Sequence, residues 1–376
     1  MIRVLHILDT MASGGVERRR LSIAKFLDPS KFELKIICTN AVGPFPDEIR
    51  QLGVEVIAIG DLKSFLDFKQ HQKVIKVINE FKPHIIHGAV FEGVTMAAIS
   101  GFLKRVPIII LEETSDPQTR SWKGNLLMKS FSYMADQIIG VSPAATNYLL
   151  HQLKLPNNKV KLINNGVAIP AKVSEEVANN LKIRLKIKED EVVIGSVGRM
   201  SSDATKRFSD LIKAFALLYK KNPKTKLVLV GEGREVDNYK KLVDDLAIKD
   251  NVLFMGYQHE IGQFYAIFDV FCLVSAHESF GLVLAEAMLH QLPVVATRVG
   301  GMQYIVDDAI TGYLVEKYDV DAMFQKLEVL VTDQKIRCDL GKKGLEKALS
   351  QYTEERYVRD VQLLYTELLL KKKVLY

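Results

Sequence analysis

Two glutamates, Glu278 and Glu286, stand in the run His-Glu-Ser-Phe-Gly-Leu-Val-Leu-Ala-Glu. A strand pattern covers residues 269–274 and a helix pattern follows Gly281, so we expect Glu278 on a loop and Glu286 on a helix with Ser279 as its N-cap. Glu278 would then project past a helix tip whose free N–H groups attract anions such as phosphate. A carboxylate there must reach beyond the anion to hydroxyl groups, which predicts a ligand with a phosphate and a polyol, such as a nucleotide sugar. A plain helix with two surface acids is the alternative.

Two cations could serve the same ligand. Arg199 follows the first strand pattern of the second half of the chain, and Lys206 comes before the next helix. Together they can neutralise a pyrophosphate leaving group and so do the work of a metal ion. Solvated surface cations are the alternative. No metal site is predicted, because Asp319 of Asp319-Val320-Asp321 is better explained as a helix N-cap.

Glycine turns at strand ends supply backbone N–H and C=O groups that suit a nucleotide. Ordinary tight turns are the alternative. None has the Gly-x-Gly-x-x-Gly pattern of a dinucleotide site. Besides the charged residues, the candidate donor-binding residues are Gly14, Gly15, Gly231, Met255, Gly256, Tyr257, Phe280, Gly281 and Leu282.

Polar residues also end two strand patterns in the first half. His87 closes one, and Glu112 and Glu113 close the next. We expect all three on the acceptor side of a site, with Glu113 also a catalytic candidate. A lone histidine at a strand end also fits a purely structural role.

Apolar runs of strand length alternate with amphipathic runs along the whole chain, which indicates an α/β fold with parallel strands covered on both faces. The first series predicts an N-terminal doubly wound domain over residues 1–166, and the second predicts another over 191–353. Residues 167–190 are expected as a linker, and a last helix within 354–376 is expected to pack back on the first domain. Ligands of such sheets bind at the carboxyl ends of the strands, so we expect a cleft between two Rossmann-like domains. The expected strands are 4–8, 34–38, 54–59, 85–87, 107–111, 137–141, 192–197, 226–230, 252–254, 269–274, 293–296 and 313–315.

Composition narrows the class of protein. The chain has 376 residues, 48% of them hydrophobic, and a net charge of +6. The three cysteines have no disulfide or zinc spacing. No apolar run reaches the ~18 residues of a membrane span, and no motif for nucleic acid occurs. We therefore expect a cytoplasmic protein that does not bind nucleic acid.

Peripheral contact with an anionic membrane at the inner face of the cytoplasmic membrane is a further expectation. Residues 119–134 mix aromatic, aliphatic and basic side chains, and the triplets 18–20 and 371–373 are basic. Such a mixture suits a membrane interface. A helix that faces the core is the alternative.

Taken in order along the chain, these motifs resemble glycosyltransferase family 4, the retaining GT-B enzymes. The resemblance is carried by Gly14-Gly15-Val16-Glu17, Val141-Ser142, Asn165-Gly166-Val167, Gly198-Arg199 with Lys206, the run from Glu278 to Glu286, Leu292-Pro293-Val294-Val295-Ala296-Thr297 and Gly300-Gly301. It implies the GT-B fold and a nucleotide-sugar donor, with UDP as the commonest base. It also implies a glycan or lipid-linked acceptor in bacterial surface polysaccharide synthesis.

The resemblance implies roles for single residues as well. Arg199 and Lys206 would bind the donor diphosphate, Glu278 hydroxyls of the transferred sugar, and Glu286 the ribose. The anomeric configuration would be kept, and neither a cofactor nor a divalent metal would be required.

Three features depart from the family pattern. Glu113 stands where many members have a histidine, and the spacing from Arg199 to Lys206 is longer than usual. Gln303-Tyr304 replaces the usual acidic residue after Gly300-Gly301.

Three other functions remain open from sequence. A UDP-N-acetylglucosamine 2-epimerase has a similar fold and uses the same donor without an acceptor. A nicotinamide dehydrogenase would need the missing dinucleotide fingerprint. A catalytically silent sugar-binding protein would have no need of both glutamates and both cations.

Overall fold

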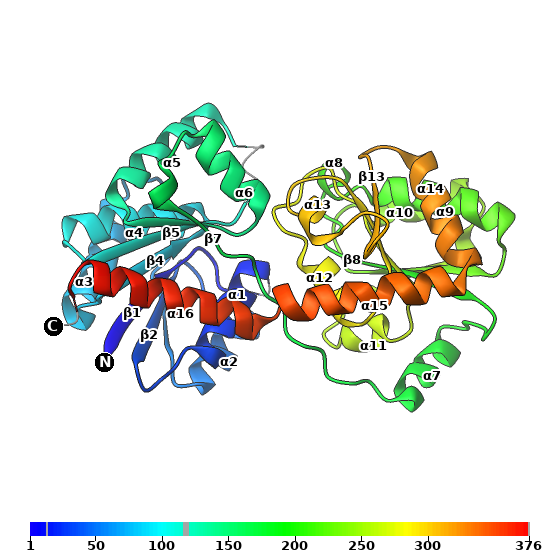
Figure 1. The fold of residues 1–376 in the computed structure, drawn as a ribbon, viewed down its shortest axis with the longest axis horizontal. Helices are drawn as coiled ribbons and strands as arrows, with labels where there is room; N and C mark the ends of the chain where they lie inside the picture. Colours follow the sequence, from blue (N-terminus) through cyan, green and yellow to red (C-terminus); the bar gives the residue numbers. More distant parts are fainter. Residues whose placement is uncertain (13, 116–119, 375–376) are drawn as a thin grey trace. The chain divides into compact units, whose positions relative to one another are not determined.

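The structure is a computed structural model, and it describes residues 1–12, 14–115 and 120–374. The chain forms two compact units (Figure 1). Unit 1 consists of residues 1–166 with 354–376, and unit 2 of residues 167–353. The stretch 167–190, expected as a linker, belongs to unit 2. It contains helix α7 (Glu175–Arg184), and its Leu181 and Ile187 lie in the unit's core.

Unit 1 is built on a parallel seven-stranded sheet in the order β3-β2-β1-β4-β5-β6-β7. Successive residues of a strand point to opposite faces, so Val4 packs with α1, α2 and α16 while Leu5 packs with α3, α4 and α5. Its elements are β1 (Ile2–Ile7), α1 (Gly15–Phe26), β2 (Phe32–Cys38), α2 (Phe45–Gln51), β3 (Glu55–Ala58), α3 (Phe68–Phe81), β4 (Ile85–Ala89), α4 (Val90–Leu103), β5 (Ile108–Glu113), α5 (Trp122–Met134), β6 (Gln137–Gly140), α6 (Pro143–Asn147), the π-helix η2 (Tyr148–Gln152), the 3₁₀-helix η3 (Asn157–Lys159), β7 (Val160–Leu162) and α16 (Glu354–Lys371).

Unit 2 has a parallel six-stranded sheet in the order β10-β9-β8-β11-β12-β13. Helices α9, α10 and α14 cover one face, α7, α11, α12 and α13 belong to the other, and α15 contributes to both cores. Its elements besides α7 are β8 (Val192–Val197), α8 (Asp203–Lys206), α9 (Phe208–Lys221), β9 (Thr225–Val230), α10 (Val236–Asp245), the 3₁₀-helix η4 (Lys249–Asn251), β10 (Val252–Phe254), α11 (Gly262–Tyr265), β11 (Val270–Leu273), α12 (Leu282–Leu289), β12 (Val294–Thr297), α13 (Met302–Ile305), β13 (Gly312–Val315), α14 (Val320–Thr332) and α15 (Gln334–Gln351).

The expected fold class is confirmed, since every predicted strand overlaps a strand of the structure. One strand was missed. β7 has three residues, of which Lys161 and Leu162 are exposed. An exposed edge strand this short gives no apolar run in the sequence.

In both sheets the strand order reverses once. The reversal lies between β1 and β4 in unit 1 and between β8 and β11 in unit 2. Ligands of doubly wound sheets bind at the carboxyl ends of the strands on either side of such a point. Arg199 follows β8 and Glu278 follows β11, so these predicted site residues flank the switch point of unit 2.

Among the described residues, no helix combines the length and the apolar character needed to cross a membrane.

Candidate active site

Three glycine loops stack on one another at the carboxyl ends of β8, β9 and β10. The Gly198 amide donates to Val230 O at 3.0 Å, and the Gly231 amide donates to Gly256 O at 2.8 Å. Gly231 has φ +134°, and a Cβ on it would lie 2.0 Å from Gly198 O. Only glycine fits there. The loop that carries Arg199 is therefore held on a fixed backbone, and the Arg199 side chain is exposed on it.

The loop after β10 carries three further candidate donor-binding residues. The Met255 amide donates to Leu229 O at 2.9 Å, and Gly256 has φ +64°. The Tyr257 side chain is 55% exposed. The structure thus brings together the backbones of Gly231, Met255 and Gly256, with Tyr257 beside them.

Lys206 and Glu278 form an ion pair. Lys206 Nζ lies 2.5 Å from Glu278 Oε2, and the two side chains are 25% and 18% exposed. The backbones are joined as well, because the Ala276 amide donates to Thr205 O at 2.8 Å. A predicted cation and a predicted acid are thus adjacent and remain open to a ligand.

The segment from Arg199 to Lys206 is longer than the family pattern, and a network of hydrogen bonds and ion pairs holds it in place. Arg207, in the left-handed region at φ +38°, donates to both oxygens of Asp210 at 2.8 and 2.7 Å. It also lies 3.3 Å from Asp203, which accepts a hydrogen bond of 2.9 Å from Tyr239 Oη. Since Asp203 begins α8 and Lys206 ends it, this network fixes the helix that presents Lys206.

The charge of Asp203 is maintained by its partners. Burial would raise the pKa of this carboxyl, but hydrogen bonds from Ser209 and Tyr239 and the charge of Arg207 outweigh burial and lower that pKa. Sequence analysis did not identify Asp203, Arg207 or Tyr239. The i, i+4 spacing of Asp203 and Arg207 was the only local signal.

The loop of Glu278 packs against Gly300-Gly301. The Gly301 amide donates to Glu278 O at 3.0 Å. Gly300 has φ +48°, and a Cβ on it would lie 1.7 Å from the same oxygen. Gln303, which departs from the family pattern, donates its amide to Gly300 O at 3.0 Å. A carboxylate could not donate this bond, so the substitution stabilises the loop in a different way.

Helix α12 starts later than expected. The prediction of Ser279 as N-cap is wrong, because the chain turns through Gly281 at φ +101° and the helix begins at Leu282. The first bond of the helix runs from the Leu284 amide to Gly281 O at 2.9 Å. The backbone N–H groups of residues 280–283 precede it and can face an anion. Phe280 can contribute only its backbone, because its side chain is 3% exposed in the core.

Glu286 lies on α12 and is held by Tyr265. Tyr265 Oη donates to Glu286 Oε2 at 3.0 Å, and the tyrosine ring stacks on His290 with centroids 4.6 Å apart. The sequence pattern placed Glu286 on the helix correctly but gave no sign of Tyr265.

In unit 1, Gly14 is the N-cap of α1 and Gly15 is its first residue. A Cβ on Gly14 would lie 2.6 Å from Glu17 Oε2. This helix tip follows β1, one of the two strands at the switch point. Ser13, the neighbouring residue of the motif, lies outside the described residues.

His87 and Glu112, expected on the acceptor side, are instead buried in a closed ring of polar groups. Arg20 donates to Glu112 and to His6 Nδ1, the latter at 2.7 Å. Tyr365 Oη of α16 lies 2.8 Å from His6 Nε2 and 2.7 Å from His87 Nδ1. His87 Nε2 lies 3.2 Å from Glu112 Oε2, which closes the ring.

The hydrogen-bond donors of this ring determine which nitrogen of each histidine carries the proton. Arg20 can only donate, so His6 Nδ1 accepts and the His6 proton is on Nε2. His6 then donates to Tyr365, and Tyr365 donates to His87 Nδ1. The His87 proton is therefore on Nε2, facing Glu112. Both histidines are then neutral. His87 Nε2 lies within ion-pair distance of Glu112 but does not meet hydrogen-bond geometry, and Arg20 Nε also has no hydrogen-bond partner within the described part of the chain.

The pKa shifts agree with this assignment. Burial lowers the pKa of His6, and the charge of Arg20 lowers it further. Burial also lowers the pKa of His87, against the opposing effect of Glu112. Burial alone would raise the pKa of Glu112, but Arg20 and His87 outweigh it and bring that pKa to about 2. An acceptor contact by His87 or Glu112 would require the ring to open.

Glu113 is buried beside this ring but is not part of it. Its Oε1 accepts from Arg120 at 2.6 Å and from Ser115 at 2.9 Å. Its Oε2 has no hydrogen-bond partner within the described part of the chain. The catalytic and acceptor-side roles predicted for Glu113 remain predictions.

Family models match both halves of the chain. The model described as Glycosyltransferase Family 4 matches residues 13–169, and the model described as Glycosyl transferases group 1 matches residues 177–347. With the two Rossmann-like sheets, these matches define a GT-B glycosyltransferase. The chain belongs to glycosyltransferase family 4.

Individual relatives cover the chain to different extents. The chain is 30% identical to N-acetyl-alpha-D-glucosaminyl L-malate synthase of Bacillus anthracis over 66% of its own length and 64% of that protein. It is 24% identical to the capsular polysaccharide biosynthesis glycosyltransferase CapM of Staphylococcus aureus, over 98% of this chain and 97% of that one. The fold matches the crystal structure of HepE from Anabaena in complex with UDP, with a TM-score of 0.87, 21% identity and coverage of 97% and 100%.

Proposed function

We propose that this glycosyltransferase moves a sugar from a UDP-sugar to a glycan or lipid-linked acceptor in the synthesis of a bacterial surface polysaccharide or glycoconjugate. The anomeric configuration is kept in this proposal, and no divalent metal or other cofactor takes part. The observation that carries it is the ion pair of Lys206 and Glu278 beside the switch point of unit 2.

The charges account for the leaving group. A nucleoside diphosphate gains negative charge as the glycosidic bond breaks, and fixed cations stabilise that charge without reorganising. Lys206 is braced through Asp203, and Arg199 is exposed on a fixed loop. The amides of residues 280–283 add an anion site at the tip of α12. In this role Lys206 binds the diphosphate while Glu278 accepts hydrogen bonds from sugar hydroxyls.

The remaining roles follow the same logic. Glu286, oriented by Tyr265, accepts from ribose hydroxyls, and the loops at Gly231 and Gly256 bind the base through backbone groups. Gly14 and Gly15 at the tip of α1 contribute backbone groups to donor binding. Glu113 serves the acceptor side.

Two findings on similar proteins support the substrate classes. The Anabaena protein of the same fold was crystallised with UDP, which favours UDP as the donor base. The names of the two relatives differ: one is an N-acetyl-alpha-D-glucosaminyl L-malate synthase, and the other is a glycosyltransferase of capsular polysaccharide biosynthesis. We infer a polysaccharide acceptor because CapM aligns along nearly its whole length.

A UDP-N-acetylglucosamine 2-epimerase-like reaction is the second candidate, since it uses the same donor. Incubation with UDP-N-acetylglucosamine alone separates the two, because an epimerase converts the donor without an acceptor. NADH binding would instead favour a dehydrogenase.

We also propose that the enzyme works in the cytoplasm in peripheral contact with the inner face of the cytoplasmic membrane. The relative named for capsular polysaccharide biosynthesis supports this location, because polymers of that kind are assembled at a membrane.

The test is a thermal-shift panel of nucleotides and nucleotide sugars, since a ligand raises stability according to its affinity. We expect UDP and at least one UDP-sugar to raise the melting temperature. Transfer to a glycan acceptor is then followed by NMR, with retained anomeric configuration and no loss on adding EDTA as the expected results. Stabilisation by NADH but by no nucleotide sugar would contradict the proposal.

A further inference from the structure

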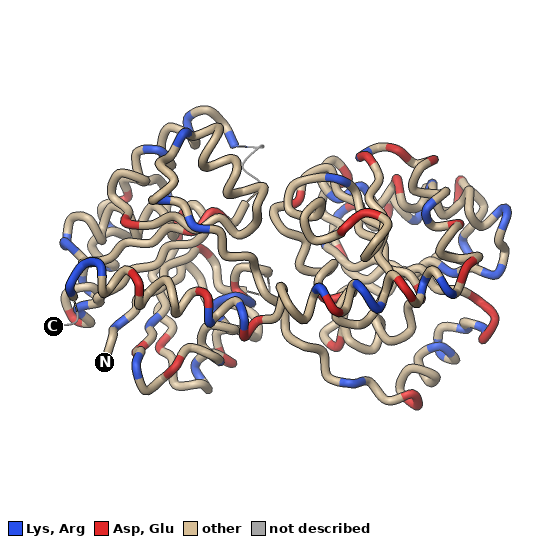
Figure 2. The backbone as a smooth tube through the Cα atoms, in the orientation of Figure 1, with Lys and Arg blue, Asp and Glu red and all other residues tan. Residues whose placement is uncertain are grey.

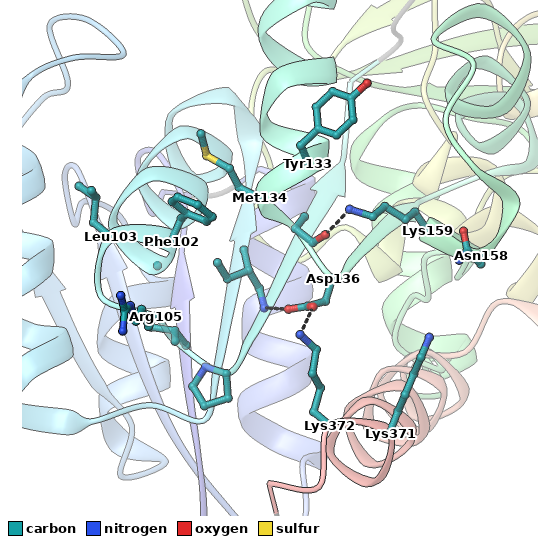
Figure 3. Close-up of a pocket in the computed structure, with 15 residues that line it drawn as sticks. Phe102, Leu103, Arg105, Tyr133, Met134, Asp136, Asn158, Lys159, Lys371 and Lys372 are labelled. Carbon is teal, nitrogen blue, oxygen red and sulfur yellow. Dashed lines mark hydrogen bonds and ion pairs between the residues drawn. The ribbon is translucent and has the colours of Figure 1, made fainter.

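A hollow of about 770 Å³ opens at the amino ends of β5 and β6 in unit 1. It lies where α4, α5 and α16 end, and Figure 3 shows side chains from all three around it. Because the strands are parallel, this edge of the sheet is the one opposite the α1 tip with Gly14 and Gly15. The hollow therefore does not belong to the candidate active site.

Large apolar side chains surround the hollow and face solvent. Phe102 and Leu103 at the end of α4 are 57% and 62% exposed, and Tyr133 near the end of α5 is 76% exposed. The outer face of α5 continues this apolar character, with Trp122 and Leu126 also exposed. Its inner face packs Met128 and Phe131 in the core. The predicted membrane segment thus has both a core face and an exposed apolar face, while Thr119 lies outside the described residues.

The charge around the hollow is positive. Its lining includes four cations and one carboxylate, Asp136. Lys372 pairs with Asp136 at 2.6 Å, and Lys159 donates to Ser132 O and Ala135 O at 2.8 Å each. The other two cations, Arg105 and Lys371, are exposed and have no carboxylate partner among the described residues. The N-terminal triplet 18–20 adds nothing here, because Arg19 and Arg20 are buried.

Compensation of helix ends explains only part of this pattern. Cations near a helix C-terminus offset its negative end, and Lys159 does this for α5. That role does not require Phe102, Leu103 and Tyr133 to be exposed beside the cations. Apolar and aromatic side chains interleaved with basic ones are typical of surfaces that enter the interface of an anionic bilayer.

We propose that Phe102, Leu103, Arg105, Tyr133 and Lys371, here called the amino-edge surface, dock unit 1 on an anionic phospholipid bilayer. The apolar side chains enter the interface, and Arg105 and Lys371 bind lipid phosphates at the mouth of the hollow. This inference rests on the proposed peripheral contact with the membrane and assigns it to particular residues.

The location constrains the acceptor. β5 runs from the hollow at Ile109 to Glu113 at the opposite edge of the sheet. Five residues of strand span about 17 Å. An acceptor anchored in the same bilayer must reach at least that far before it meets the carboxyl edge of unit 1. This geometry favours an extended glycan over a sugar linked directly to a lipid.

The test is co-sedimentation of the full chain with vesicles of phosphatidylcholine, with and without phosphatidylglycerol. We expect binding to the anionic vesicles that falls with salt and little binding to pure phosphatidylcholine. Arg105→Asn with Lys371→Gln should weaken binding roughly 25-fold, at about five-fold per basic residue. Phe102→Asp with Leu103→Asp should abolish it. Asparagine suits position 105, where φ is +52°.

The matched control is Ile183→Asp with Arg184→Gln on α7 of unit 2, where Ile183 is 73% exposed. It should bind vesicles like the wild type. Equal losses in control and test variants, or none in either, would overturn the proposal. So would a concentration-dependent dimer, seen by size exclusion without lipid, that Phe102→Asp disrupts, since a second copy would then cover the surface.

Donor stabilisation by UDP is measured on the variants of the amino-edge surface, all of which lie in unit 1. We expect it to be unchanged, because unit 2 is unaltered. A variant that loses vesicle binding but keeps the UDP shift supports the docking surface. Vesicle binding by a wild type that no nucleotide sugar stabilises would contradict the proposed function alone.

Discussion

The two units carry polar and charged residues on or beside the central strands of similar sheets and use them in opposite ways. In unit 1, His87 lies in the middle of β4, not at its end as expected, and Glu112 lies near the end of β5; both are buried in a ring with Arg20. In unit 2, Lys206 and Glu278 beside β8 and β11 are paired but partly exposed. Figure 2 shows charged residues spread over both units, so charge alone does not mark a site. A candidate site is marked instead by charged side chains that are partly exposed and can still form hydrogen bonds to a ligand.

The difference follows from what covers each strand end. In unit 1, α16 packs on α1 and contributes Tyr365, which completes the ring. In unit 2, the segments after the strands contain glycines, which have no side chains to cover the strand ends. The hydrogen bond to Asp203 supports the helix of Lys206, and Gly300 packs against the backbone of Glu278. The ring therefore stabilises a fold, while the open pair is available for chemistry. The predictions below separate these two uses.

The largest effect on stability is expected from Arg20→Met. It leaves the Glu112 carboxylate buried without its cation, which costs about 3–5 kcal/mol. Urea unfolding measures the loss, with Arg359→Met on the exposed side of α16 as control, since Arg359 is 67% exposed. Stability within error of the wild type would mean that the ring does not hold unit 1 together.

The largest effect on activity is expected from Lys206→Met. Loss of a positioned charge that stabilises a transition state lowers turnover by roughly 100- to 1000-fold, here with little change in the urea midpoint. Lys213→Met, on the exposed side of α9, is the control and should keep full turnover. Initial rates of sugar transfer are compared for Lys206→Met and Lys213→Met. Equal rates for the two variants would show that Lys206 does not take part in the reaction.

An intermediate effect on stability is expected from Tyr365→Phe. The hydroxyl both accepts from His6 and donates to His87, so its removal leaves two buried ring nitrogens unsatisfied at about 1–3 kcal/mol. Hydrogen exchange of β1 and β4 should become faster. Tyr133→Phe, on an exposed tyrosine, should leave exchange unchanged, and the same result for Tyr365→Phe would disprove the bonding order of the ring.

Acid should destabilise unit 1 in two stages. His6 and His87 have pKa values lowered from 6.5 in the folded state, so the unfolded state binds more protons below that pH and stability falls. Glu112 has a pKa lowered from 4.5 to about 2, so a second loss begins below pH 4.5. Urea midpoints measured from about pH 8 down to about pH 2, which spans the ordinary and the shifted values, record both. His87→Asn should reduce the first stage, whereas His259→Asn at an exposed site should not.

The smallest effect is expected from Tyr239→Phe. It removes one hydrogen bond to Asp203, worth about 0.5–1.5 kcal/mol, and loosens the turn that presents Lys206. The value of kcat/KM for the donor should fall by about two- to ten-fold. Tyr219→Phe, whose ring stacks on Phe215, serves as control. A change in stability without a change in kcat/KM would show that the brace does not position Lys206.

Local patterns in the sequence predicted most of unit 2's candidate site. Glycine at a strand end and a cation before a helix are signals within a few residues, which is why the Gly231 loop, Lys206 and Glu278 were found. The N-cap was misassigned because Ser279 is a common capping residue, whereas the left-handed turn that decides the helix start is at Gly281.

The ring could not be predicted from the sequence in the same way. Its members come from β1, α1, β4, β5 and α16, and Tyr365 is 278 positions from His87. An acid at a strand end has the same local pattern whether it is open or covered. Glu112 is structural because Arg20 of α1, 92 positions away in the chain, pairs with it, and that contact has no short-range signature.

Calorimetric titration with UDP tests the central claim, that the open cation of unit 2 binds the donor diphosphate while the covered charges of unit 1 do not. We predict that the wild type and Lys213→Met bind UDP equally and that Lys206→Met binds at least about ten-fold more weakly, as expected for the loss of a charged hydrogen bond worth about 1.5–3 kcal/mol. Equal UDP affinity of Lys206→Met and the wild type, with both variants folded, would contradict the account.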